Sequence, residues 1–597
     1  MLEPQTRMAL TEQLAPPPGF ELIHAVGTTF TLDLETALSV PLSFASRRIT
    51  ADDGELGIFE ALRRATEKVD IFAQAGALSA GTQSKLVAFL EAMVHPVTHP
   101  GGLFHPKVWF LEYGNDDDDE DERAYRFLCA SRNLTSDRSW DVILRLDGEV
   151  PDGRSSAEAR EMNASLVELL RALPGMAVHP LGEERRARVD ALAERWSEIV
   201  WEDPPGLELL DFHVFGLQVP PEPDLEGSQA LVISPFVSCD QLATMRAGVT
   251  GHTILLSRAD SLDQLEPASL KGRIETRVLD EMAVEDAVQD QGSERLVGLH
   301  AKVAVVDYHH SSRMFIGSAN ATVAGWGHNV EVMVELEGRR RNVGTQAVLE
   351  AMGELVEDYP TEGGEPADPS EDVRWMLDGV LRELAALRLT VTVTGSGPYD
   401  LRVTSADPVP GARDSAAGAP TVRWRPLRHT AEYEISELGG EGGVVTNVAL
   451  AEVTPFIEFI ARHPDGTTRR TLALAQLHGD PPDRGQAIIA EQLTNREAFV
   501  HLLRLMLELT RSGSAGTWVF DRRGQFAGGG VDPGSGTGLF EALLRAVAVG
   551  HDGLEEVRKL IDYLSRHAGD DAVVPEGFES LWSAVWSAHE LAGGESS

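Results

Sequence analysis

The sequence predicts an α/β protein built from two similar halves that share one site, followed by a β-rich domain and a helical C-terminal region. Three observations support this prediction. Strand-like and helix-like segments alternate over residues 20–340, and a short His-x-Lys pattern with a matching downstream tail occurs once in each half of that region. Beyond residue 386 the pattern changes to alternating apolar residues and then to helical spacing.

In the first half, strands and helices are expected in alternation. The expected strands are 20–30, 69–75, 107–113 and 125–130, and the expected helices are 33–40, 56–66 and 82–93. Such alternation is typical of a sheet that is largely parallel and covered by helices. Helical spacing continues over 155–173 and 183–201, and proline clusters at 204–205 and 220–223 mark the passage into the second half.

The second half repeats the alternation. Its expected strands are 230–237, 252–257, 274–279, 302–308 and 313–317, with a helix at 240–248. Two further helices are expected at 345–359 and 373–386, separated by a loop rich in Gly, Pro and acidic residues. Two similar halves that each carry one copy of a motif indicate duplication, with a site where they join.

The last third of the chain has a different character. Alternating apolar residues over 387–478, with a Pro-Asp-Gly turn at 464–466, predict a β domain. Helices are expected at 486–510, 538–549, 554–567 and 578–591. We therefore expect six segments: a first half (1–150), a helical connector (151–205), a second half (206–340), a helical linker (341–386), a β-rich domain (387–480) and a helical C-terminal domain (481–597).

Composition and charge restrict the function classes. The 597 residues carry a net charge of −42, so the chain as a whole would be repelled by DNA and by anionic membranes. Two cysteines cannot form a disulfide framework, which favours buried thiols in a reducing compartment. The sequence shows no signal peptide and no apolar run of about 18 residues that would span a membrane. These features predict a cytoplasmic protein with no membrane contact.

The first copy of the motif begins at His105, with Lys107 two residues later. Glu112 follows after four residues, and Ser131 and Asn133 form a Ser-x-Asn tail. A single His-x-Lys pattern is a weak signal, because a histidine and a lysine commonly lie together at the polar edge of a strand.

The second copy gives the pattern its weight. It has His300 and Lys302, then Asp307, then a tail of Ser318 and Asn320. The chain holds only six lysines, and two of them stand two residues after a histidine in matching contexts. If each pair lies on a strand, its two side chains point to the same face and meet one ligand.

These residue types suit the cleavage of a phosphodiester without a metal. One histidine can attack phosphorus and hold it covalently, while the other donates a proton to the departing oxygen and then activates water. The lysines neutralise charge on the phosphoryl oxygens, and the Asn and Ser side chains can donate hydrogen bonds to them. Each histidine also needs an acceptor on its other ring nitrogen, a role that a carboxylate fills best.

The two copies resemble the HxKxxxxD motif of the phospholipase D superfamily, over residues 20–340. The resemblance implies two α/β/α sandwich halves with one shared active site, a phosphohistidine intermediate, and no metal or cofactor. It implies a carboxylate that orients each histidine, Glu331 in the second copy and Asp141 in the first. The first copy departs from the pattern, since Glu112 replaces the usual Asp and Ala130 the usual Gly before Ser131.

The expected roles are accordingly as follows. The catalytic residues are His105, Lys107, His300, Lys302, Asn133, Asn320, Asp141 and Glu331; Ser131 and Ser318 bind the substrate phosphate; Glu112 and Asp307 are structural acids. The sequence leaves open which histidine is the nucleophile.

Three functions compete on this basis. A nuclease, acting on DNA in a bacterial anti-phage or restriction system, agrees with the superfamily and with an acidic chain that receives its substrate from a helicase-type partner. A phospholipase or lipid phosphotransferase and a non-catalytic scaffold of a defence complex are the alternatives. The acidic run 116–122 near the first motif is either a solvated loop tip or a gate that repels nucleic acid.

Overall fold

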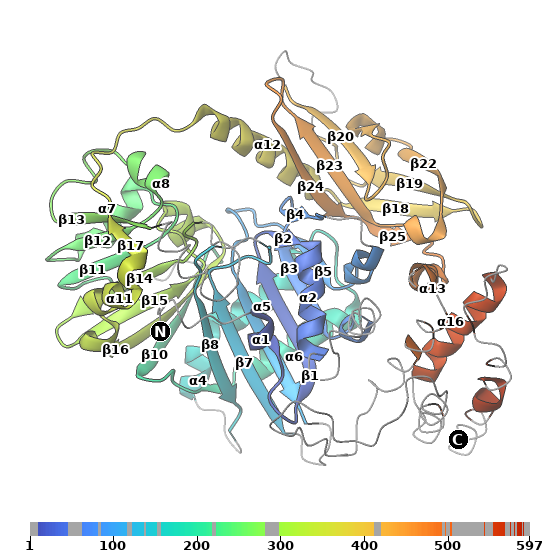
Figure 1. The fold of residues 1–597 in the computed structure, drawn as a ribbon, viewed down its shortest axis with the longest axis horizontal. Helices are drawn as coiled ribbons and strands as arrows, with labels where there is room; N and C mark the ends of the chain where they lie inside the picture. The colour runs from blue at the N-terminus through green and yellow to red at the C-terminus, as the bar shows by residue number, and fades with distance from the viewer. Residues whose placement is uncertain are drawn as a thin grey trace.

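The computed structural model describes residues 10–45, 63–81, 85–115, 122–136, 139–151, 157–217, 223–280, 298–410, 419–491, 553–567 and 582–587, with isolated positions between 493 and 589. Figure 1 shows two sheets side by side, a β-rich domain above the first of them, and the C-terminal helix α16 (Gly553–His567) at the far side. The acidic residues 116–121 and the expected helices 56–66 and 538–549 lie mostly or wholly outside the described residues.

The first sheet has seven strands in the order β5-β3-β1-β6-β7-β8-β9. These strands are β5 (Val94–Val97), β3 (Val69–Gln74), β1 (Glu21–Thr29), β6 (Val108–Gly114), β7 (Arg123–Ala130), β8 (Ile143–Glu149) and β9 (Val200–Trp201). The strands β5, β3 and β1 run parallel and each later pair is antiparallel, so the sheet is mixed and the expectation of a largely parallel sheet is wrong. All six residues of β3 and all seven of β6 are buried, as expected of strands covered on both faces.

The second sheet has eight strands in the order β10-β16-β15-β14-β11-β12-β13-β17. These strands are β10 (Leu207–Phe215), β16 (Glu331–Arg339), β15 (Ser311–Gly317), β14 (Val303–Tyr308), β11 (Gln229–Ile233), β12 (Thr253–Leu256), β13 (Ile274–Leu279) and β17 (Val356–Asp358). Here β11, β12 and β13 run parallel, and β14, β15 and β16 follow antiparallel.

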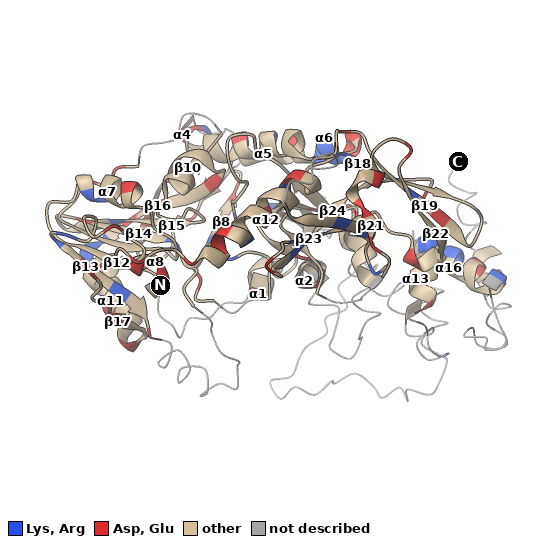
Figure 2. Ribbon diagram, turned by 90° about the horizontal axis from the view of Figure 1, so that it is seen from above, with Lys and Arg blue, Asp and Glu red and all other residues tan. Residues whose placement is uncertain are grey.

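The two sheets therefore have the same order of strands around the motif. In each, three parallel strands are followed by a strand that starts just after His-x-Lys, a strand that ends at Ser-x-Asn, and a third antiparallel strand. The described helices α4 (Ala157–Met162), α5 (Ala164–Met176) and α6 (Glu183–Trp196) cover one face of the first sheet, and Figure 2 shows them on the opposite side from α1 (Leu10–Leu14) and α2 (Leu34–Ala45).

One hydrophobic core joins the inner faces of both sheets. It contains Phe110 and Phe127 of the first sheet, Val303 and Val305 of the second, and Trp196 of α6. The ring of Trp196 is fully buried, and its centroid lies 5.0 Å from that of Phe110. Because this core is continuous, the two halves are fixed relative to each other around the motifs.

The β-rich domain is attached to the first half through a shared sheet. Strands β20 (Thr421–Pro426), β21 (Tyr433–Glu434), β23 (Phe456–Arg462) and β24 (Thr468–Leu474) join β4 (Leu78–Ser79) and β2 (Leu32–Asp33), in the order β2-β4-β24-β23-β20-β21. A second sheet has the order β22-β19-β18-β25, formed by β22 (Gly443–Val448), β19 (Tyr399–Ser405), β18 (Leu389–Thr394) and β25 (Gln476–His478). Helix α12 (Pro369–Ala385) packs against β23 and β24.

Some element expectations are wrong. The helix expected at 345–359 ends as α11 (Thr345–Met352), because Gly353 takes a φ of 55° that stops a right-handed helix. The chain then returns to the second sheet as β17. The described part of the helix expected at 82–93 is a 3-10 helix, Lys85–Leu90. The helix expected at 486–510 is not contradicted: α13 (Arg484–Ala490) matches its start, Arg496, Phe499, Leu502 and Leu503 are also helical, and most of the rest lies outside the described residues.

A search of the described helices finds none that combines the length and the apolar character needed to cross a bilayer.

Candidate active site

The folding of each half brings its motif to one edge of its sheet. In the first half β1 and β6 are antiparallel, so the end of β1 lies beside the start of β6 and Thr28 Oγ1 accepts a hydrogen bond from Val108 N at 3.0 Å. In the second half Ile233, the last residue of β11, pairs with Val303, the first residue of β14. Each His-x-Lys segment therefore precedes a strand rather than lying within it, which corrects the expected strand placement.

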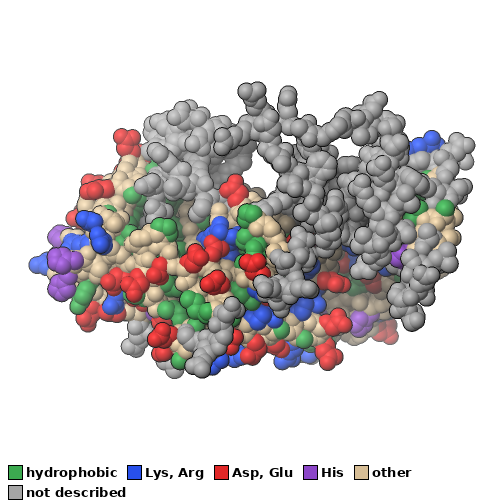
Figure 3. Space-filling view, turned by 90° about the horizontal axis from the view of Figure 1, so that it is seen from below, with side chains coloured by type: hydrophobic (Ala, Val, Ile, Leu, Met, Phe, Trp, Pro, Cys, Tyr) green, Lys and Arg blue, Asp and Glu red, His purple; other side chains and the backbone are tan. Residues whose placement is uncertain are grey.

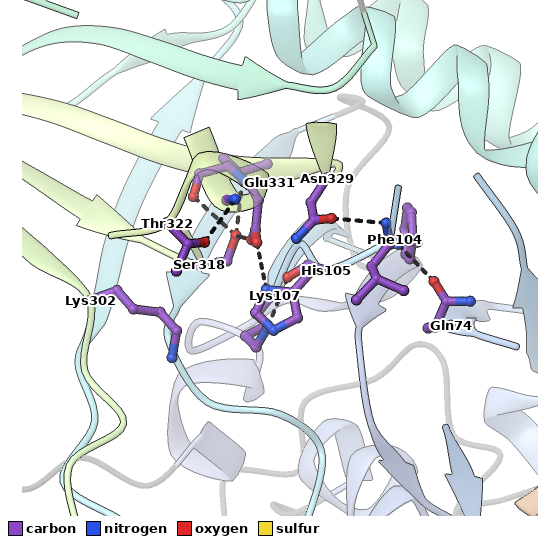
Figure 4. A network of polar contacts seen from close by, with 12 residues as sticks. Gln74, Phe104, His105, Lys107, Lys302, Ser318, Thr322, Asn329 and Glu331 are labelled. Atoms are coloured by element: carbon purple, nitrogen blue, oxygen red, sulfur yellow. Dashed lines mark hydrogen bonds and ion pairs between the residues drawn. The ribbon is translucent and has the colours of Figure 1, made fainter. Parts of the chain in front are cut away.

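The histidine of the first half is held by a carboxylate of the second. The ring nitrogen Nδ1 of His105 lies 2.7 Å from Oε1 of Glu331, and the glutamate is fully buried. Ser318 also donates its hydroxyl to the other oxygen of Glu331. Figure 4 shows this network, with Glu331 between Ser318 and His105 and with Lys302 beside it.

The histidine of the second half is held in the same way by a carboxylate of the first. Nδ1 of His300 lies 2.9 Å from Oδ1 of Asp141. Ser131 donates its hydroxyl to the same oxygen at 2.9 Å, and Ser139 donates to Oδ2 at 2.9 Å. Both carboxylates therefore contact a histidine across the junction of the two halves, an exchange that the sequence did not reveal.

The backbone makes the same exchange. His105 N donates to the carbonyl of Val330 at 2.9 Å, and His300 N donates to the carbonyl of Trp140 at 3.0 Å. Val330 and Trp140 each immediately precede the carboxylate of their own half. The crossed side-chain pairs are thus held by crossed peptide pairs, so that neither histidine is positioned by its own half alone.

Two side chains that the sequence did not single out hold the peptide before His105. Gln74 at the end of β3 accepts a hydrogen bond from Phe104 N through Oε1 at 2.7 Å. Asn329 of the second half accepts one from Leu103 N through Oδ1 at 2.9 Å. The place of Gln74 at the carboxyl end of a parallel strand was the available signal, since ligand sites gather at that edge.

The serines of the two tails contact carboxylates rather than open space. Ser131 and Ser318 are fully buried, and each donates to the carboxylate of its own copy. Each also accepts from the backbone, Ser131 from Val142 N and Ser318 from Val332 N, both at 3.0 Å. In this structure the hydroxyls position the carboxylates, which differs from the expected contact with phosphate.

The asparagines lie at the ends of the same tails. Asn133 Oδ1 accepts from Thr31 N at 3.4 Å. Within the described part of the chain, Asn320 Oδ1 is buried and has no hydrogen-bond partner. A buried amide oxygen without a partner is costly, so the Asn320 side chain is available to a ligand in the site.

A hydroxyl at the end of each central strand holds the asparagine loop. Thr29 Oγ1 accepts from Leu134 N at 3.1 Å, and Ser234 Oγ accepts from Ala321 N at 2.9 Å. Leu134 and Ala321 each follow the asparagine of their own copy, so Thr29 and Ser234 occupy equivalent positions. Sequence reasoning did not assign either residue this role.

The two lysines are buried, and each bends back toward its own histidine. Lys107 Nζ donates to the carbonyl of His105 at 2.8 Å, and Lys302 Nζ donates to that of His300 at 2.6 Å. Lys107 is 2% exposed and Lys302 is 1% exposed. Burial lowers the pKa of Lys107 well below its ordinary value. Burying two cations in one place is unfavourable unless an anion joins them.

The surroundings shift the pKa values of the two histidine–carboxylate pairs differently. Burial lowers the pKa of His105 well below its ordinary value, and the charges of both lysines and of the other histidine lower it further. Burial raises the pKa of Glu331 to about 8. For Asp141, burial on its own would raise the pKa, but the hydrogen bond and charge of His300 bring it below its ordinary value. Burial also lowers the pKa of His300, although its bond to Asp141 opposes this.

The two motif acids are buried away from the histidines. Glu112 accepts from Arg123 Nη1 at 2.7 Å and from Arg195 Nη2 at 2.6 Å. Asp307 accepts from the hydroxyls of Ser312 and Thr345, both at 2.8 Å. Both acids are saturated by protein partners, which agrees with a structural role.

No group of three or more His, Cys, Asp or Glu side chains in the described residues is arranged to hold a metal ion.

Comparisons with known proteins find similarity at the level of fold. No protein-family model matches the chain, and no curated protein matches its sequence. Among solved structures, yeast tyrosyl-DNA phosphodiesterase is 11% identical over 56% of this chain and 88% of its own, with a TM-score of 0.33. A variant of the same yeast enzyme is 9% identical over 58% and 88%, with a TM-score of 0.35.

Polyphosphate kinase from Porphyromonas gingivalis is 13% identical over 63% of this chain and 51% of its own, with a TM-score of 0.33.

Proposed function

We propose that this chain is a metal-independent phosphodiesterase of the phospholipase D type, with one active site formed by two duplicated halves. The observation that carries the proposal is the crossed pairing, His105 with Glu331 and His300 with Asp141. Two oriented histidines and two buried lysines converge on one position, and a phosphoryl group supplies the negative charge that this position lacks.

We assign the nucleophile to His105. A nucleophilic imidazole must be neutral, and the pKa of His105 is held well below its ordinary value. When Nδ1–H donates to Glu331, the lone pair of Nε2 is free to attack phosphorus. The new N–P bond replaces the P–O bond to one ester oxygen, giving a phosphohistidine.

We assign the general acid to His300. Its Nε2–H gives a proton to the departing ester oxygen, and the carboxylate of Asp141 stabilises the imidazolium before the transfer. In the second step neutral His300 takes a proton from water, whose oxygen attacks phosphorus and breaks the bond to His105. Lys107 and Lys302 neutralise the charge on the phosphoryl oxygens in both steps.

We propose nucleic acid, specifically DNA, as the substrate, on the basis of the motif resemblance. The net charge of −42 opposes unaided binding of a polyanion, and acidic and basic side chains are interspersed over the described surface in Figure 3. This charge supports delivery of DNA by a helicase-type partner in a bacterial defence system. The last 200 or so residues, which the catalytic scheme does not use, are where we place that contact.

The test is cleavage of single- and double-stranded DNA and RNA in EDTA by wild type, His105→Ala and His300→Ala. The proposal expects cleavage by the wild type that persists in EDTA and is lost in both variants. Cleavage that EDTA abolishes, or that either variant retains, would contradict the two-histidine mechanism. Phosphatidylcholine vesicles in a parallel assay examine the lipid alternative, because hydrolysis of the lipid without cleavage of any nucleic acid overturns the assigned substrate.

A further inference from the structure

A large apolar side chain stands exposed on the second half, in the loop that follows β11. Phe236 is 48% exposed, although phenylalanine is among the residues most often buried. The guanidinium of Arg258 lies over its ring, with Cζ 5.0 Å from the ring centroid. Arg258 therefore lies against the ring while nearly half of the side chain remains accessible to a ligand.

Several hydrogen bonds tie this loop to the active site. Ser234 Oγ donates to the carbonyl of Phe236 at 2.7 Å and accepts from Ala321 N, which follows Asn320. Arg258 Nε donates at 3.0 Å to the carbonyl of Leu299, the residue immediately before His300. The exposed ring and its cation are thus held by the same backbone that positions His300 and Asn320.

The neighbouring rim is apolar as well. Val323 is 43% exposed, and its N donates to Ser238 Oγ at 3.2 Å in the turn that follows Phe236. On the other side of the site, Phe30 follows β1 and its ring centroid lies 5.0 Å from that of His105. One aromatic side chain therefore lies against His105, and another stands on the loop whose hydrogen bonds reach the neighbours of Asn320 and, through Arg258, of His300.

We propose that Phe236 is a stacking platform for a nucleobase next to the scissile phosphate, and that the substrate is single-stranded nucleic acid. This proposal rests on the proposed phosphodiesterase function and names the form of its substrate. An exposed aromatic ring beside a phosphate site suits a strand whose bases are free to stack, and Arg258 adds a cation beside the backbone. In a duplex each base is already stacked and paired, so its face is not available to a protein side chain.

The stacking is independent of sequence, because every base presents an aromatic face. The platform therefore predicts a substrate preference set by strandedness rather than by base identity. It also gives an acidic chain a source of affinity for DNA that does not depend on counterion release.

The experiment measures binding of single-stranded DNA that carries the fluorescent base 2-aminopurine, with the full chain in a His105→Ala background so that the DNA stays intact. A matched oligonucleotide with abasic sites has the same phosphates without bases. The proposal expects the base-bearing strand to bind more tightly, by roughly 5- to 150-fold, the range for stacking of one base. Adding Phe236→Ala removes this difference, and adding Phe236→Trp retains it.

Tyr308→Ala is the matched control. Tyr308 is also 48% exposed, but it ends β14 at the opposite end of the strand from Lys302. The Tyr308→Ala variant should leave the difference in affinity between the base-bearing and the abasic oligonucleotide unchanged. Equal binding of both oligonucleotides, no binding of either, or an equal loss with Tyr308→Ala would overturn the platform.

The two proposals fail separately in this design. Base-dependent binding that requires Phe236, in a protein whose wild type cleaves no phosphodiester, supports the platform and contradicts the catalytic function. Cleavage by the wild type, with the same kcat/KM for a strand and a duplex and no effect of Phe236→Ala, overturns the platform and leaves the phosphodiesterase in place.

Discussion

Asp141, in the first half of the chain, accepts a hydrogen bond at 2.9 Å from Nδ1 of His300, in the second. Glu331 in the second half makes the reciprocal contact with His105 in the first, at 2.7 Å. Each half therefore supplies one histidine and the carboxylate that orients the other half's histidine. The site is complete only when both halves are folded and packed together, which accounts for the continuous core between the two sheets.

Replacing either orienting carboxylate by its amide is expected to remove most of the activity. In Asp141→Asn or Glu331→Gln the amide still fills the space, but it no longer favours an imidazole that carries its proton on Nδ1. His105 needs this form to leave the Nε2 lone pair free, and His300 needs an acceptor at Nδ1 while its Nε2 is protonated. We expect kcat to fall roughly 100- to 10,000-fold with little change in KM, as for a carboxylate that orients a catalytic histidine. Steady-state kinetics check this, with Ser139→Ala, which removes a single hydrogen bond to Asp141, as the milder control.

The same variants show whether activity is lost because the histidine is misoriented or because the protein is unfolded. Each amide variant should retain the circular dichroism of the wild type, and its pH profile should change as well as its kcat. If Asp141→Asn kept more than half of the wild-type kcat, the crossed pairs would be structural contacts and the proposed role of Asp141 would be wrong.

Removing the hydroxyl of Thr29 is expected to weaken both stability and catalysis. Thr29→Val leaves the buried Leu134 N without an acceptor, which costs about 1–3 kcal/mol in the free energy of unfolding. The displaced loop carries Asn133, so kcat/KM should fall as well. Urea denaturation and kinetics of Thr29→Val beside Thr29→Ser check this, since the serine retains the acceptor. A Thr29→Val variant as stable and as active as Thr29→Ser would show that the hydroxyl does not hold the loop.

An anion in the site is expected to raise the pKa of both histidines. In the free protein the pKa of His105 and of His300 lies below its ordinary value, first because of burial and then because of nearby positive charge. The neutral histidines therefore favour the folded state above pH about 6.5, and this stability is lost as the pH falls through the lowered folded values. Inorganic phosphate in the site should offset the repulsion between the protonated histidines and the nearby positive charges. Its stabilising effect on the folded protein should therefore grow as the pH is lowered.

Melting temperatures measured between pH 5.5 and 8, with and without phosphate, check this expectation. The double variant His105→Ala/His300→Ala should show a flatter dependence in the absence of phosphate. Glu331 acts at the other end of the range: its pKa is raised to about 8, so the stability it contributes is present at low pH and lost as the pH rises through about 8. A stabilising effect of phosphate that is the same at every pH would contradict an anion site between the two histidines.

Glu112 is expected to contribute to stability and not to chemistry. Both of its oxygens bind arginines, and the side chain is fully buried. Glu112→Ala should lower the free energy of unfolding by about 3 kcal/mol, the low end for a broken buried pair, because both arginines are partly exposed to solvent. Urea denaturation measures this, and kcat at a temperature where the variant is folded should remain that of the wild type. A large loss of kcat in the folded variant would assign Glu112 to the site.

The sequence indicated the α/β character and the candidate site residues because their signals are local. The two His-x-Lys pairs, their Ser-x-Asn tails and the following carboxylates lie within short stretches of chain. The partners could not be predicted, because nothing local states that His105 meets Glu331 rather than Asp141. The roles of Gln74 and Thr29 could not be predicted either, because they arise where the carboxyl ends of strands distant in sequence meet.

Long-range strand pairing explains the remaining differences in the fold. The sequence predicts the end of a helix where the structure has β17, because the three residues of this strand gain their partner from β13, far back along the chain. The pairing of Leu472 in β24 with Leu78 in β4 joins the β-rich domain to the first half, again through contacts without a local signal. A glycine with a positive φ, Gly353, was the one local mark of the change at β17.

Detection of the covalent intermediate would decide whether His105 is the nucleophile. Wild type and His105→Ala would be mixed with single-stranded DNA carrying ³²P at internal phosphates, quenched in base, in which phosphohistidine survives, and digested for peptide mapping. We expect a label on the peptide that contains His105, which accumulates in His300→Ala and is absent from His105→Ala. Cleavage of the DNA by the wild type without any labelled peptide, or a label that persists in His105→Ala, would contradict it.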